Sequence, residues 1–165
     1  MRMLKHRSLM LVVVWGAVAG CTVVAVKPVD RRQHDMRLVC IEHNQAVKMS
    51  GFLPMLEKSF ADHGISTLRY DGKPPEQCEY TADYVAHWNW DLAVYMTDAE
   101  VHVRRGGEVV GNAVYHLRNK GGLDMSKWSS ANSKMQPVMN ELLNQFVRSN
   151  AAAGAVHPAD VPERK

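Results

Sequence analysis

The chain has 165 residues, with 20 Lys or Arg and 17 Asp or Glu, a length that suits one domain and leaves little room for a second. Arg2, Lys5 and Arg7 lie at the very start, so the remainder of the chain is electrically balanced. A balanced chain gives no electrostatic reason to expect nucleic acid as a partner, and we exclude that class.

Residues 1–20 show the three parts of a secretory signal peptide. A basic start, Met1–Arg7, precedes an apolar run from Leu9 to Val18, and small residues follow it. The run is shorter than the roughly 20 apolar residues that a membrane-spanning helix needs. A buried N-terminal helix is the alternative, but it would show polar residues on one side, and this run has none.

The residues Val18-Ala19-Gly20-Cys21 resemble the lipobox of bacterial lipoproteins, although most such proteins have Leu where Val18 stands. The resemblance implies cleavage before Cys21, a diacylglyceryl group on its sulfur and an acylated amino terminus. More than one acyl chain gives stable membrane anchoring. Thr22 replaces the Asp associated with inner-membrane retention, which implies the outer membrane, with the domain facing the periplasm.

Cys40 and Cys78 are the only cysteines besides Cys21. An exported chain lies where disulfides form and persist, so we expect these two residues to pair. Two free buried thiols, or a pair of metal ligands, are the alternatives. The sequence has no CxxC spacing that would support metal binding.

We expect the globular domain to span residues 37–148. Residues 21–36 are interpreted as the lipidated terminus followed by a linker, with Pro28 and a polar run over Asp30–Asp35. Residues 149–165 are rich in Ala, Pro and charge without an apolar period, which predicts a disordered tail.

Apolar periodicity within the domain predicts, in chain order, a strand, a helix, four more strands and a final helix. The strands are expected at 37–42, 65–70, 78–90, 92–104 and 108–118. The helix faces carry Phe52, Leu56 and Phe60 in the first helix, and Met135, Val138, Met139, Leu142, Leu143 and Phe146 in the last. Both helices can cover one face of the sheet. The fold class is therefore α/β (α+β), a two-layer β-α-β-β-β-β-α sandwich with both helices on one face of a mixed, mostly antiparallel sheet.

The third strand has the clearest alternation, which places Tyr80, Tyr84, Trp88 and Trp90 on one face. These rings either face the helices as core or leave an exposed surface for a partner, to which Trp128 would add. Trp88, Trp90 and Trp128 are our candidates for such a surface.

A three-residue loop at 105–107 is expected to join the last two strands. It would place Arg104 opposite Glu108 and His116 opposite Met96. This register pairs the charges and keeps His116 apart from His102.

The sequence offers no recognised catalytic or metal-binding pattern. Its histidines form no HExxH motif and no close His/Cys cluster, and neither a GxSxG elbow nor a phosphate-cradling glycine spacing occurs. We therefore expect no catalytic, cofactor-binding or metal-ligating residues, and a protein that is not an enzyme.

Several short motifs, in this order, make the chain similar to the Sbal-type family of small uncharacterised proteobacterial lipoproteins. They are Phe52-Leu-Pro-Met-Leu56, Cys78-Glu-Tyr-Thr81, Trp90-Asp91, Tyr115-His-Leu-Arg118 with Gly121-Gly122, and Lys134-Met135 with Pro137-Val138. The resemblance covers nearly the whole mature domain. It implies a conserved domain of unknown activity and transfers no catalytic or binding residue. The element order is also similar to that of accessory lipoproteins in lipid and lipopolysaccharide transport, at the level of the fold alone.

These observations favour a non-enzymatic lipoprotein, held to the membrane by the Cys21 lipid, that binds or scaffolds an unidentified envelope protein. The alternative is a periplasmic inhibitor, or a lipid or ligand carrier accessory to envelope transport.

Overall fold

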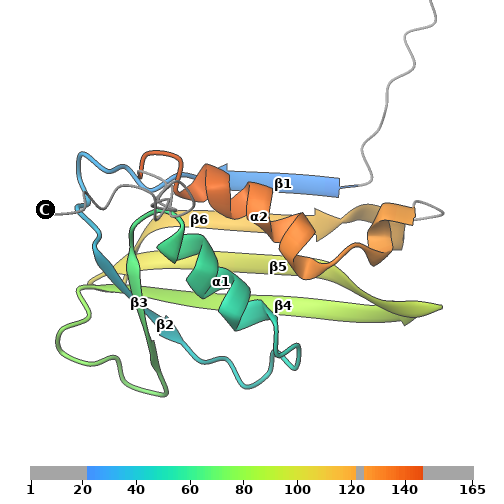
Figure 1. Ribbon diagram of the computed structural model, residues 1–165, viewed down its shortest axis with the longest axis horizontal. Coiled ribbons are helices and arrows are strands. Elements are labelled where there is room, and N and C mark those ends of the chain that lie inside the picture. Colours follow the sequence, from blue (N-terminus) through green and yellow to red (C-terminus); the bar gives the residue numbers. More distant parts are fainter. Residues whose placement is uncertain (1–21, 122–124, 147–165) are drawn as a thin grey trace, which may run out of the picture.

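A computed structural model describes residues 22–121 and 125–146 (Figure 1). The predicted signal peptide, Cys21 and the predicted tail at 149–165 lie outside these ranges. Among the residues described, no helix is long and apolar enough to cross a bilayer.

The domain is built on one six-stranded sheet. Its strands are β1 (Thr22–Lys27), β2 (Leu38–Glu42), β3 (Ser66–Tyr70), β4 (Tyr80–Asp91), β5 (Ala93–Arg105) and β6 (Glu108–Leu117). The spatial order is β1-β6-β5-β4-β2-β3. β2 is parallel to β3 and to β4, and every other neighbouring pair is antiparallel. The predicted fold class, a mixed and mostly antiparallel sheet with two helices, is confirmed.

Helix α1 (Phe52–Ala61) forms the crossover between the parallel strands β2 and β3. Pro54 lies in the first turn, where its missing N–H costs no hydrogen bond. The helix ends just before Gly64, whose φ of 75° suits glycine. Phe52, Leu56 and Phe60 are fully buried against the sheet, as their spacing predicted.

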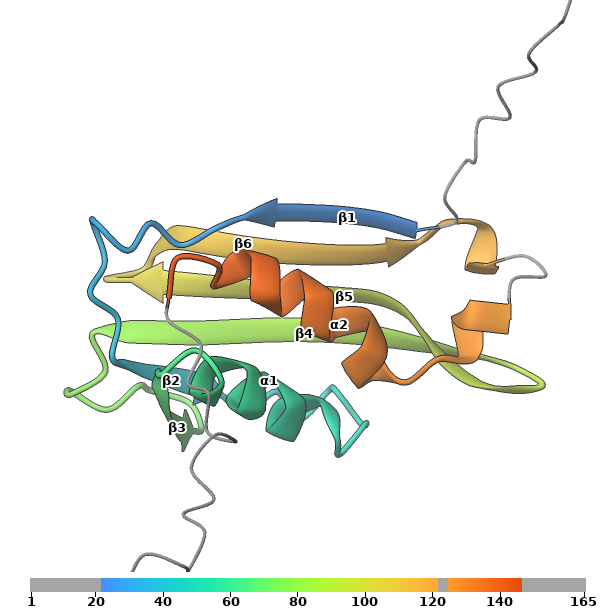
Figure 2. The ribbon, with the colours of Figure 1, turned by 45° about the horizontal axis from the view of Figure 1, so that its top comes forward.

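Helix α2 (Ala131–Leu142) lies beside α1 on the same face of the sheet (Figures 1 and 2). The Ser130 side chain caps it by accepting a hydrogen bond from the Ser133 N–H. All six residues of the predicted stripe are buried, including Leu143 and Phe146, which follow the last helical residue. Two short 3-10 helices, η1 (Arg118–Gly121) and η2 (Met125–Trp128), lie between β6 and α2.

The predicted linker at 21–36 is wrong for most of its length. Residues 22–27 form β1, an edge strand paired with β6. Val29 and Met36 are buried in the core, and the Val29 N–H donates to the Leu142 carbonyl at 3.0 Å. A side chain at Gly111 of β6 would meet Val29 at 2.5 Å, so this segment packs closely on the sheet. The sequence of residues 21–36 resembles that of a linker because the edge strand is largely exposed and a polar turn follows it.

The predicted register of the β5–β6 hairpin is also wrong. Gly106 and Gly107 have φ values of 57° and 88° and make a two-residue turn, so Arg105 pairs with Glu108. A bulge beside Arg104 then restores the alternation of apolar side chains. In consequence His116 lies opposite Asp98 and not opposite Met96.

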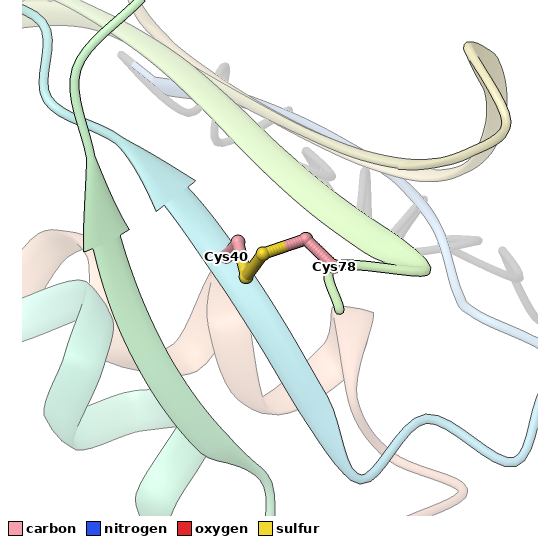
Figure 3. Close-up of a disulfide and its surroundings, with 2 residues drawn as sticks. All are labelled: Cys40 and Cys78. Atoms are coloured by element: carbon pink, nitrogen blue, oxygen red, sulfur yellow. A yellow bond between two sulfur atoms is a disulfide. The ribbon is translucent and has the colours of Figure 1, made fainter. Parts of the chain in front are cut away.

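The expected disulfide between Cys40 and Cys78 is present (Figure 3). It joins β2 to the residue that precedes the start of β4 by two positions, with the two Cα atoms 5.7 Å apart. The bridge closes a loop with a sequence separation of 38, for which the chain-entropy account gives about 4 kcal/mol of stabilisation.

We expect Cys78→Ala to lower the free energy of unfolding by about 2–4 kcal/mol, since the unfolded chain regains the freedom of that loop. Chemical denaturation followed by circular dichroism measures this change. The internal control is a reductant, which should destabilise the wild-type protein by a similar amount and leave the variant unchanged. Equal stability of the two proteins without reductant would contradict the prediction.

Candidate functional site

The aromatic stripe predicted on β4 divides into a buried and an exposed part. Tyr80 and Tyr84 are buried, the latter against Phe52 of α1. Trp88 is half-buried, and Trp90 is 71% exposed. The reason is that β4 and β5 extend past the helix layer, as Figure 2 shows, so nothing covers the last residues of the stripe. The tyrosines are therefore core residues, and Trp90 is an exposed aromatic side chain.

The β4–β5 hairpin ends in a projecting apolar group. Trp90 pairs with Val94, which is 53% exposed, and Leu92, in the turn between them, is 82% exposed. We call Trp90, Leu92 and Val94 the apolar tip. Met125, at the start of η2, is a further large apolar side chain that is 75% exposed.

The turn that carries the apolar tip is held by η2. Lys127 is buried, and its ammonium donates to the Asp91 carboxylate at 2.7 Å. The Trp128 indole N–H donates to the Asp91 backbone carbonyl at 2.8 Å. Lys127 also lies over the rings of Trp128 and Tyr95, 4.4 and 5.5 Å from their centroids. These contacts hold the hairpin in place.

Leu92 has a φ of 60°, and it is the one non-glycine residue with positive φ among the residues described. The left-handed conformation costs a residue with a Cβ roughly 1–2 kcal/mol, a cost that glycine avoids. Such strain persists where the surrounding contacts impose it, here the pairing of Asp91 with Ala93 on either side.

Trp88 and Trp128 line one pocket, together with Phe52 of α1 and Val94 of the apolar tip. Its volume is about 280 Å³, at or below the lower limit of ordinary ligand sites. The Trp88 indole N–H is buried, and within the described ranges it has no hydrogen-bond partner. The pocket has room for one small group, but not for a whole lipid.

The sheet face opposite the helices is polar and charged. At its centre Asp83 accepts hydrogen bonds from Arg104 at 2.7 Å and from His102 at 3.3 Å. Four residues further along the strands, on the same face, His116 donates to Asp98. This face, which we call the open face, is therefore not the bare apolar surface that would suit hydrophobic docking.

Burial of the Asp98 carboxyl would raise its pKa, but hydrogen bonds from His116 and Thr97 outweigh burial and lower the pKa below 3.8. A carboxyl with a lowered folded pKa stabilises the fold above its ordinary pKa. That contribution is lost as the pH falls through the folded value.

The structure brings together some of the sequence-predicted site residues and not others. Cys40 and Cys78 are joined, and Trp88 and Trp128 share a pocket, whereas Trp90 projects beyond it. Cys21 lies outside the described residues. In the described part of the chain, no group of three or more His, Cys, Asp or Glu is placed to hold a metal ion.

Sequence reasoning missed Leu92 and the contact between Lys127 and Asp91. Leu92 was assigned to the start of a strand, where an apolar residue is unremarkable. The Trp90-Asp91-Leu92 turn has no Gly or Asn to mark it. The approach of Lys127 depends on how η2 packs on β5, for which the sequence has no signal.

No protein-family model matches the chain. No curated protein matches it either. Among solved structures, the chain is similar to a PelC dodecamer from Paraburkholderia phytofirmans, with 11% identity and a TM-score of 0.44. This match covers 72% of the present chain and 97% of that one. A variant of the same dodecamer, in another crystal form, has 12% identity, a TM-score of 0.43 and the same coverage.

We expect Asp91→Asn to lower the free energy of unfolding by about 1–3 kcal/mol, because the buried Lys127 ammonium loses its charged acceptor. Half of the Asp91 side chain is exposed, so the larger cost of breaking a fully buried pair does not apply. Urea denaturation monitored by tryptophan emission measures the change. Asp62→Asn, which removes the exposed Lys58–Asp62 pair, is the matched control and should cost about 0.5 kcal/mol or less. Equal losses in the two variants would argue against the role given to Lys127.

We expect His116→Ala to raise the pKa of Asp98, since the carboxylate loses a donor and burial then dominates. Carbon-13 NMR titration of the aspartate carboxyls measures it. His43→Ala, which removes the exposed contact to Asp71, is the control and should leave Asp98 unchanged. A downward shift of the Asp98 pKa in the His116 variant would show that another group sets it.

Proposed function

We propose that this chain is a lipid-anchored protein of the bacterial cell envelope that binds or scaffolds another envelope component. The observation that carries the proposal is the lipobox-like run Val18-Ala19-Gly20-Cys21 at the end of an apolar segment. Thr22, the residue after that cysteine, is paired with Leu117 of β6, so a lipid on Cys21 would lie directly beside the sheet.

The disulfide gives independent support for an exported chain. Cys40 and Cys78 are bonded, and such bridges form and persist in the periplasm but are rare in the cytosol. Thr22 after the cysteine favours the outer membrane by the rule for such lipoproteins. The domain would then face the periplasm from the inner leaflet.

The open face is the surface we assign to a protein partner. Its charged side chains are arranged in pairs, as in Asp83 with Arg104, with exposed Val85 close by. Polar and paired groups favour a specific, reversible contact over an obligate apolar interface.

The alternative function, carriage of a lipid or other ligand, has one observation in its favour, the pocket beside Trp88 and Trp128. Its volume of about 280 Å³ is too small for a phospholipid, which restricts a carrier role to a small apolar group. Titration with aromatic or short acyl probes, followed through tryptophan emission, would detect such a role.

We expect the full chain, expressed in a bacterium, to incorporate labelled palmitate and to fractionate with membranes. Cys21→Ser should abolish both, because the thiol is the acceptor for the lipid. Cys78→Ser is the control, since it removes a thiol that is not in the lipobox. Unchanged labelling and fractionation of the Cys21 variant would refute the anchor.

A photo-crosslinking residue at Val85 should give one discrete adduct with an envelope protein in living cells. The same residue at Met49, which is equally exposed near the start of α1, is the control and should give none. The same adduct from both positions, or none from Val85 in a labelled and membrane-bound protein, would contradict the open face as the partner surface.

A further inference from the structure

The apolar tip lies at the end of the sheet where the chain enters the domain. Val23 pairs with His116, which pairs with Asp98 on β5. From that row, Leu92 lies six residues away along β5, or about 20 Å at roughly 3.3 Å per residue. Thr22 lies one residue from the row in the same direction. Figure 2 shows the start of β1 and the β4–β5 hairpin at the same end of the molecule.

We propose that the apolar tip inserts into the interfacial layer of the same bilayer that holds the Cys21 lipid. The domain then has two contacts with one membrane, the acyl chains and the side chains of Trp90 and Leu92. This inference rests on the lipid anchor proposed above.

We choose a bilayer as the partner of the apolar tip because the tip belongs to the same hydrogen-bonded sheet as Thr22, the residue that follows the proposed lipid attachment point. Since β1 pairs with β6 from Thr22 on, no linker separates the sheet from Cys21. The Cα atoms of bonded residues are about 3.8 Å apart, so the lipid keeps this end of the sheet close to the headgroups. Along the strands, Leu92 lies about 17 Å beyond Thr22. A tilt of the sheet then brings the apolar tip into the membrane interface.

The chemistry of the tip suits a membrane interface. Tryptophan is enriched at the headgroup level, where its ring is apolar and its N–H can still be hydrated. Aliphatic side chains of interfacial elements are buried about 5–10 Å below the headgroups. Asp91, the only charged residue between Trp90 and Val94, is paired with Lys127, so insertion needs no anionic lipid.

The strained backbone conformation of Leu92 gives a second reason to infer that its side chain has a role outside the fold. The side chain is 82% exposed, so it contributes little to the core, yet it occupies a position where glycine would be less strained. The domain thus retains an exposed leucine at a cost to its own stability. Contact with a bilayer explains why that residue is apolar.

The test uses the full, lipidated chain reconstituted into phosphatidylcholine vesicles that contain brominated acyl chains, which quench tryptophan at short range. We expect the wild-type emission to be quenched and Trp90→Phe to lose at least half of that quenching. Trp88→Phe, the same substitution two residues earlier on β4, is the matched control and should retain it. The quenching should not change between low and high salt, because the contact is apolar.

Leu92→Gly separates contact with the membrane from folding. It removes the side chain and the strain together, so the urea midpoint should stay equal or rise, while the quenching of Trp90 should fall. A lower urea midpoint together with unchanged quenching would mean that Leu92 serves the fold, and the inference would be overturned.

Labelling with palmitate in the same preparations distinguishes the two proposals. Labelled protein whose quenching is equal in the wild type and in Trp90→Phe would overturn membrane insertion of the tip and leave the anchor intact. Unlabelled protein with quenching that depends on Trp90 would overturn the anchor, and with it the two-point attachment, and would show that the tip contacts lipid without the anchor. Unlabelled protein without such quenching would overturn both.

Discussion

The antiparallel pairing of β1 with β6 fixes where the chain enters the domain, because Thr22 already lies opposite Leu117. Behind β1, Val29 is buried and donates a backbone hydrogen bond to Leu142 at the end of α2. The N-terminal segment is thus part of both layers. A group attached at the residue before Thr22 would therefore lie directly beside the sheet.

The two helices cover one face of the sheet but not its full length. Phe52, Leu56 and Phe60 of α1, with the stripe of α2, bury the middle of the sheet, where the hydrophobic effect supplies most of the folding free energy. The β4–β5 hairpin continues past them and ends in uncovered Trp90 and Leu92. Polar contacts from Lys127 and Trp128 hold the turn in the absence of a covering helix.

The molecule therefore presents surfaces of different character. The apolar tip is a small group of exposed side chains at the end where the chain enters. The open face carries charge pairs such as Asp83 with Arg104 along the sheet. A bilayer contact and a polar protein contact can use these surfaces at the same time, since the tip extends from the end of the strands and the open face lies along them.

The sequence by itself determined the fold class, both helices and the disulfide, because these depend on local periodicity and on the count of cysteines. The six-residue stripe of α2 and the aromatic alternation of β4 are repeated signals, and each needs no knowledge of what packs against it. Tertiary structure alone decided the role of residues 22–27, the hairpin register that brings His116 to Asp98, and the exposure of Trp90. Residues 22–27 are an edge strand because they pair with β6, and the hairpin register depends on a bulge beside Arg104. The exposure of Trp90 depends on where the helix layer ends. Each of these depends on residues distant in the sequence.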